Sequence, residues 1–362
     1  MSRSRIALAG VGIAAAAGLL AGCSAGPAPA PGPSDSGGDD AAPATLTFVA
    51  YGGTGQDAMI AAWQEPYTAE HPNVTFVNTS PPDVAQVKAQ VDAGQVQWDI
   101  LATAPYAAEQ NCGTLFEPLD LSDVDQTDLV PGTIGECYIG NFINTTPFAY
   151  RTDAFPDPAT APKTIEDFFD VAKFPGQRGV LTNLQNGILE YGLLGDGVAP
   201  DDVYPIDVDR SLAKWDTIRD QTLFAPNVGA LQQAVAAQQV DMFLLADSRL
   251  VPTMNEGMDI TIVWDKTVVA INAFAVPLGS KNLAVAEDFL KTVVLPDRAA
   301  AISEALGVAP VNTAANPKLT GNAAKLDVFG AVNTGETLVQ DNTWYADNFN
   351  EVTATLTTWL AG

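Results

Sequence analysis

The sequence predicts an α/β fold in which two lobes, each with helices packed on strands, flank a central cleft. Strand-like and helix-like segments alternate from residue 45 onward, pause in a turn-rich stretch over 114–140, and then resume in a second block. Such alternation favours parallel strands joined by helical crossovers. The 362 residues are enough for one large or two medium domains.

The first block has the order strand, helix, strand, helix, strand. A strand over 46–51 precedes a helix that starts near Gln56, and further strands cover 73–77 and 98–101. The second helix is expected to begin at Asp83, whose carboxylate can accept the free N–H groups of a first turn. This order predicts a parallel sheet with helices on both faces.

The second block follows a strand-like run over 142–150 that Pro147 interrupts. Thr164 and Asp167 have the spacing of a capping box, which predicts a helix start. The remaining expected elements are a strand over 180–182, helical segments over 188–194, 212–218 and 231–238, and strands over 240–245, 260–264 and 268–276.

The N-terminus has the features of a secretory signal. Arg3 and Arg5 precede an apolar stretch over 6–20, shorter than the roughly 20 residues that a membrane-spanning helix needs. The stretch runs into Leu-Ala-Gly-Cys, which resembles the bacterial lipoprotein box, with Cys23 as the residue that carries the lipid. The alternative is an ordinary signal with a chance cysteine.

We therefore expect a signal peptide over 1–22 and a lipidated, disordered tether over 23–44, rich in Pro, Gly and Ser. A lipidated Cys23 would anchor the exported chain at the outer face of the cytoplasmic membrane or in the periplasm. The remaining cysteines, Cys112 and Cys137, are expected to form a disulfide in this oxidising compartment.

The charge of the chain argues against nucleic acid as a partner. It has 43 Asp and Glu against 17 Lys and Arg, a formal net charge of −26. Phosphate binding needs clustered basic residues, and anionic lipid surfaces repel such a chain. The acidity favours either solubility outside the cell or a cationic ligand.

Catalytic side chains are scarce. The single histidine, His71, lies at an expected helix end, where the helix dipole accounts for it. Ser-His-Asp and Cys-His catalysis and His-ligated zinc are therefore not expected. Carboxylate pairs such as Glu166 with Asp167 or Asp201 with Asp202 have the character of solvated surface. We expect no catalytic residue, no metal site and no cofactor.

A series of short motifs runs along the chain after the tether. In order they are LTFVAYGG (46–53), WQEPY (63–67), HPNVTF (71–76), WDIL (98–101), GTLFEPLD (113–120), KTIEDFFD (163–170), KFPGQRG (173–179), AVPLGSKN (275–282) and GVAPVN (307–312). Taken in this order, they resemble the extracellular solute-binding lipoproteins of bacterial ABC transporters, in particular the spermidine/putrescine-binding type.

The resemblance implies a two-lobed periplasmic-binding-protein fold of type II-like topology, whose discontinuous lobes close on a ligand by hinge motion. Lobe 1 would comprise 45–148 plus 273–318, and lobe 2 would comprise 149–272 plus 319–362. The implied partners are a small-molecule ligand and the membrane permease and ATPase subunits, and we expect a monomer.

Candidate ligand residues follow from strand ends and crossings. The glycines at 52, 53 and 55 allow close backbone approach to a ligand, or make a tight turn. Tyr and Trp would supply flat walls, Thr and Asn hydrogen bonds, and Asp247 or Glu190 a partner for an amine. The candidates are Tyr51, Thr54, Thr103 and Tyr106 from lobe 1, and Thr145, Asn183, Glu190, Asp247, Trp264 and Asn272 from lobe 2 and the crossings.

The residues that clamp a polyamine are largely replaced. Asn183 and Asn272 stand where the spermidine-binding type has acids, and Ala246 stands where it has a Trp. We therefore expect capture of a small polar solute, either polyamine-like or another amine or amino-acid-like compound. A secreted carboxylate-dependent hydrolase and a cell-surface adhesion or sensor domain are the alternatives.

Overall fold

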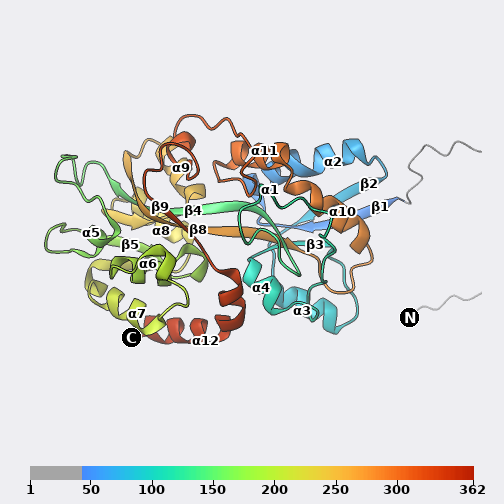
Figure 1. Cartoon of the computed structure of the whole chain (residues 1–362), viewed down its shortest axis with the longest axis horizontal. Helices are drawn as coiled ribbons and strands as arrows, with labels where there is room; N and C mark the ends of the chain where they lie inside the picture. The colour runs from blue at the N-terminus through green and yellow to red at the C-terminus, as the bar shows by residue number, and fades with distance from the viewer. Residues whose placement is uncertain (1–42) are drawn as a thin grey trace, which may run out of the picture. The chain divides into compact units, whose positions relative to one another are not determined.

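The computed structural model describes residues 43–362, which form one nine-stranded mixed sheet with helices on both faces (Figure 1). The strands lie in the order β2-β1-β3-β8-β4-β7-β5-β6, and β9 pairs with β8. Their bounds are β1 (Ala44–Val49), β2 (Val74–Thr79), β3 (Ile100–Thr103), β4 (Ile139–Arg151), β5 (Arg178–Leu181), β6 (Thr222–Ala225), β7 (Met242–Leu244), β8 (Ile260–Ala275) and β9 (Glu336–Val339).

The predicted signal peptide over 1–22, the lipid anchor at Cys23 and nearly all of the predicted tether lie outside the described residues. The first strand begins at Ala44, two positions before its predicted start. Among the described residues, no helix has the length and apolar character required to cross a membrane.

Helices connect the strands at both ends of the sheet. They are α1 (Gly53–Met59), α2 (Glu65–Glu70), α3 (Val84–Asp92), α4 (Pro105–Gln110), α5 (Ile165–Phe169), α6 (Ile188–Gly195), α7 (Val208–Asp216), α8 (Val228–Ala236), α9 (Asp247–Asn255), α10 (Leu283–Val293), α11 (Pro296–Leu306) and α12 (Asn342–Leu360). A π-helical stretch over Ile60–Gln64 joins α1 to α2, and short 3-10 turns cover Leu184–Asn186, Pro200–Asp202, Arg219–Gln221 and Ala323–Lys325.

At the β1 end of the sheet, β1 pairs in parallel with both β2 and β3, as the alternating pattern predicted. Asp83 caps α3, because its carboxylate accepts the backbone N–H groups of Ala85 and Gln86. The expected capping box at the start of α5 is also present between Thr164 and Asp167. Local side-chain chemistry therefore sets these two helix starts.

The strands β4 and β8 connect the two ends of the sheet. They pair antiparallel along most of their length, and their register shifts between Thr146 and Phe148. Pro147 lies at this shift, where a residue without an N–H is tolerated. The sequence predicted separate strands over 260–264 and 268–276, which the structure joins into one.

At the other end, β5 pairs in parallel with β6 and β7. The sequence reasoning did not identify β6, which has only four residues and lies between helical segments. Helices α5, α6, α7 and α12 share one apolar cluster, in which Trp215 and Phe168 are fully buried, and α8 and α9 contribute to a separate one.

Buried apolar residues gather into separate clusters along the sheet. The largest cluster draws its residues from 46–143 and 269–328, and a second large cluster draws its residues from 148–268 and 338–356. Each cluster thus combines segments that are far apart in the sequence. The discontinuous lobe boundaries remain a prediction, and this division of the core agrees with them in outline.

Candidate ligand-binding cleft

A pocket of about 970 Å³ lies between elements from the β1 end of the sheet and elements from the β5 end. Its walls come from the β1–α1 loop and the end of α11 on one side, and from the β5–α6 loop and α9 on the other, with the crossing strands β4 and β8 between them. The lining residues lie within 51–55, 142–144, 183–186, 304–308 and 318–323, at 246, 248, 249, 251, 252 and 255, and at Met59, Val228 and Asn272.

Four of the ten residues predicted to bind ligand line this pocket: Tyr51, Thr54, Asn183 and Asn272. Tyr51 keeps 54% of its surface exposed, so its ring is available as a flat wall. The next residue, Gly52, has a positive φ of 73°, which turns the chain sharply. A Cβ at this position would lie only 2.9 Å from Ser80 Oγ. Glycine at 52 therefore allows Tyr51 and Thr54 to face the same space.

Side-chain amides make up much of the β5–α6 wall. Asn183 accepts the backbone N–H of Asn186 at 2.9 Å, which fixes the turn over 184–186. Asn186 donates to Thr146 Oγ1 on β4 at 3.0 Å, and Gln185 donates to Asn272 Oδ1 on β8 at 3.2 Å. These bonds attach the wall to both crossing strands.

Asn272 retains an unused donor. The residue is 4% exposed, and its Nδ2 has no hydrogen-bond partner among the described residues. A buried amide N–H without a partner costs about 1–3 kcal/mol. A ligand acceptor at this edge of the pocket would remove that cost.

Glu190 was predicted as a partner for an amine, yet it is fully buried and does not line the pocket. Its Oε1 accepts hydrogen bonds from Tyr204 Oη at 2.6 Å, Gln340 Nε2 at 2.8 Å and Tyr345 Oη at 2.9 Å. Burial raises the pKa of this carboxyl above its ordinary value. In this arrangement Glu190 joins α6 to the start of α12.

Asp247, the other predicted amine partner, is also fully buried. It accepts the backbone N–H groups of Thr145 at 2.9 Å and Ser248 at 2.7 Å. Burial raises its pKa to about 7, partly opposed by these two hydrogen bonds. Thr145, also among the predicted residues, is fully buried beneath the pocket wall.

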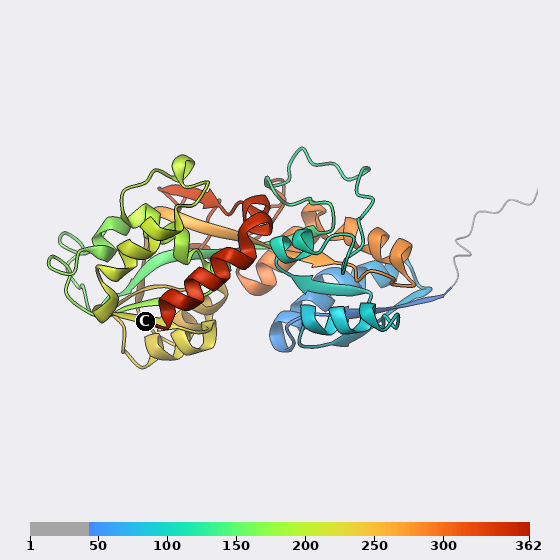
Figure 2. The ribbon, with the colours of Figure 1, turned by 90° about the horizontal axis from the view of Figure 1, so that it is seen from below.

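The remaining predicted residues lie around the pocket without lining it. Thr103 is buried at the end of β3, and Trp264 packs against the largest apolar cluster. Tyr106 is the second residue of α4, and its ring stacks on that of Phe349 of α12 with 5.1 Å between the ring centroids. Figure 2 shows α12 reaching from the β5 end of the sheet to α4, so Tyr106 lies at a contact between the two ends.

Sequence reasoning missed the charged residues of the pocket. Only three lining residues carry a formal charge, namely Arg249, Glu304 and Lys318. Arg249 and its neighbour Ser248 lie in the first turn of α9, directly after the strand that the sequence predicted over 240–245. A basic residue just past a strand end, in a chain so rich in acids, was the available signal.

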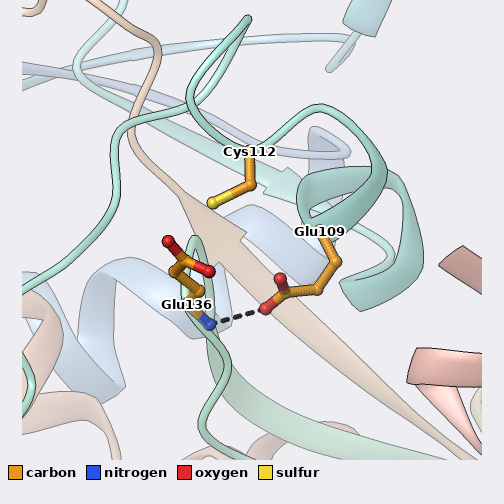
Figure 3. A group of neighbouring side chains, drawn as sticks. All are labelled: Glu109, Cys112 and Glu136. Carbon is orange, nitrogen blue, oxygen red and sulfur yellow. Dashed lines mark hydrogen bonds between the residues drawn. The ribbon is translucent and has the colours of Figure 1, made fainter.

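A cluster of two acids and a cysteine lies at the disulfide. Glu109, Cys112 and Glu136 bring two carboxylates and a sulfur together (Figure 3). The predicted Cys112–Cys137 disulfide is present, so this sulfur is not a free thiolate. Glu109 Oε1 accepts the backbone N–H of Glu136 at 2.6 Å. The group therefore does not offer the ligands that a metal ion needs.

Comparison with known proteins places this geometry among transport proteins. Residues 62–326 match the family model for bacterial extracellular solute-binding proteins. The gamma-aminobutyric acid-binding protein of Pseudomonas aeruginosa is 30% identical over 279 residues, covering 75% of this chain and 78% of the relative. The resemblance to the spermidine/putrescine-binding type is looser than these matches.

Solved structures of binding proteins have the same fold as this chain. A receptor for γ-aminobutyric acid superposes with a TM-score of 0.78 at 29% identity, covering 87% of this chain and 97% of that one. A binding protein from Agrobacterium tumefaciens R10 in complex with agropinic acid gives a TM-score of 0.72 at 28% identity, covering 88% and 99%. The predicted fold class is thereby confirmed.

Proposed function

Because the chain belongs to the family of bacterial extracellular solute-binding proteins, we propose that it captures a small amino-acid-like solute for an ABC importer. The relatives are solute-binding proteins rather than enzymes, which supports a non-catalytic role. Their role is to bind a small ligand outside the cell and deliver it to the permease. The lipid anchor at Cys23 and the monomeric state are part of this proposal.

The observation that carries the proposal is a pocket of mixed polar and apolar lining between elements from the two ends of one continuous sheet. Its walls belong to different apolar clusters, and the strands β4 and β8 cross between them. Two walls that share strand crossings can close by small changes at those crossings. We assign the lobes to 45–148 plus 273–318 and 149–272 plus 319–362, with β4 and β8 as the hinge.

Within the pocket, we propose that Tyr51, Thr54, Asn183 and Asn272 contact the ligand directly. Tyr51 offers an exposed ring, and the amides offer donors and acceptors on the opposite wall. Thr103, Tyr106 and Trp264 would contribute as the walls close. Thr145, Glu190 and Asp247 would hold the wall in place from beneath.

The size of the pocket fits a small solute. A volume of about 970 Å³ exceeds what an amino acid fills, so water or closure of the walls must complete the site. γ-Aminobutyric acid, the ligand named for two of the similar proteins, is the first compound to test.

The test is isothermal titration of the mature chain with γ-aminobutyric acid, other amino acids, putrescine and spermidine. We expect saturable binding of at least one amino acid at a one-to-one ratio, and a loss of about tenfold or more in affinity for Asn272→Ala. Asn350→Ala, an exposed position on α12, is the matched control. Binding of none of these compounds would contradict the proposal.

A further inference from the structure

The charge of the pocket is opposite to the charge of the chain. The protein carries −26, yet the pocket is lined by two bases, Arg249 and Lys318, against one acid, Glu304. That acid is already engaged, because Glu304 Oε1 accepts the backbone N–H of Lys318 at 2.7 Å. The pocket contains no aspartate at its surface. A cleft of this kind favours an anionic group on the ligand.

Arg249 differs from every other arginine in the described part of the chain. Its guanidinium makes no ion pair or hydrogen bond there, although the chain holds 43 acids. The other described arginines each engage a carboxylate or several carbonyl oxygens: Arg151, Arg178, Arg210, Arg219 and Arg298. An exposed, unpaired guanidinium that lines a cleft is available for a carboxylate, which it can bind in a bidentate manner.

A second donor in the same pocket also lacks a partner. Asn272 Nδ2 is buried at the crossing strand β8, and no described acceptor meets it. Its carbonyl oxygen is already occupied by Gln185 Nε2, so the free atom is the donor. Arg249 and Asn272 therefore both present unused N–H groups, which suits a ligand with carboxylate oxygens.

Hydrogen bonds of Asp247 hold the helical turn that carries Arg249. Asp247, two residues earlier, accepts the N–H of Thr145 on β4 and that of Ser248 in its own turn. The first turn of α9 is thereby attached to a crossing strand. An anion bound to Arg249 is thus linked through this turn to β4. In the proposed function, β4 is one of the two strands about which the walls would close.

The acids that would hold an amine in a polyamine site are not at the surface of this pocket. Glu190 and Asp247 are both fully buried, and neither lines it. We infer that the ligand carries a carboxylate and that Arg249 is its ion-pair partner, so that amines without a carboxylate are not bound. This inference rests on the proposed capture function and narrows its ligand class.

The experiment compares compounds that differ only in the charged group. The mature chain is titrated with γ-aminobutyric acid, its analogues butylamine and putrescine, and a panel of other amino acids and dicarboxylates. We expect every compound that binds to carry a carboxylate. For the tightest binder, Arg249→Gln should raise the Kd about tenfold or more, and Arg249→Lys should restore part of the affinity.

Lys281→Gln serves as the control, because it removes the same charge from an exposed position outside the pocket. Its Kd should match that of the unaltered chain. Circular dichroism of Arg249→Gln should be unchanged, since the exposed guanidinium makes no structural bond.

The outcomes separate the two proposals. If butylamine or putrescine binds as tightly as any amino acid, or if Arg249→Gln leaves the Kd unchanged, the carboxylate assignment is wrong while capture in the cleft stands. If no compound of the panel binds, the proposed ligand class fails and the role of Arg249 fails with it.

Discussion

Asp247 accepts the backbone N–H of Thr145 at 2.9 Å, and this bond joins the first turn of α9 to the crossing strand β4. Both residues are fully buried. The carboxylate thus lies between α9, which contributes a wall of the pocket, and the crossing strand β4.

The raised pKa of Asp247 predicts a specific pH dependence of stability. Its pKa is about 7 in the folded chain and 3.8 when unperturbed. A carboxyl whose pKa is raised on folding contributes stability below its unfolded pKa, and this contribution is lost as pH rises through its folded pKa. We expect the free energy of unfolding contributed by Asp247 to decrease between about pH 4 and pH 7.

Urea unfolding of the unaltered chain and of Asp247→Asn at pH 5 and pH 8 measures this term. The unaltered chain should lose more stability between the two pH values than the variant does, since Asn does not titrate. Equal losses would show that Asp247 titrates near its ordinary pKa.

Glu190 holds three donors from separate segments, and removing it should destabilise the fold. Glu190→Ala leaves the hydroxyls of Tyr204 and Tyr345 and the amide of Gln340 without their common acceptor. Each buried polar group that loses its partner costs about 1–3 kcal/mol. We expect a loss of about 3 kcal/mol or more in the free energy of unfolding, measured by chemical denaturation.

Glu190→Gln is the informative companion, because its side-chain oxygen can still accept those bonds. It should be clearly more stable than Glu190→Ala. If the two variants lose the same amount, the shape of the side chain rather than its acceptor accounts for the effect.

The fold could be predicted because its signals are local. Alternating periodicity, the cap at Asp83 and the capping box at Thr164 each depend on neighbouring residues, and all three are present. The joining of the two predicted blocks into one sheet was not predictable in the same way. It depends on the pairing of β4 with β8, whose paired residues are more than a hundred positions apart in the sequence. The strand β6 was missed because it lies directly between helical segments, and periodicity alone does not separate a short apolar run from a helix.

The pocket was only partly predictable for a similar reason. Tyr51 and Asn183 follow strand ends, where ligands of α/β sheets gather, and both line the pocket. Glu190 lies on α6, which is buried on every side, so its sequence does not indicate which way an acid points. For Arg249, the position just past a strand end was an available signal, but only the folded chain shows that its guanidinium lacks a partner.

Gly52 allows the turn that presents Tyr51, and Gly52→Ala should test this. The residue has a φ of 73°, and an added Cβ would lie 2.9 Å from Ser80 Oγ. Strain in this region costs about 1–2 kcal/mol for residues other than glycine. We expect a lower melting temperature and weaker ligand binding.

The matched control for this change is Gly55→Ala. Gly55 lies in α1, where an added Cβ meets nothing within 4 Å, and its φ is not positive. Alanine there should leave stability unchanged or raise it by up to about 1 kcal/mol. If both variants lose stability equally, the conformation of Gly52 is not the cause.

The Cys112–Cys137 disulfide closes the segment between α4 and β4, and the two cysteines are 25 positions apart in the sequence. A loop of this size contributes roughly 3 kcal/mol by restricting the unfolded chain. The double variant Cys112→Ser/Cys137→Ser should therefore lose about this amount in urea unfolding. Adding a reductant should lower the melting temperature of the unaltered chain toward that of the variant, and should leave the variant itself unaffected. A reductant effect of the same size in both proteins would mean that the disulfide is not its source.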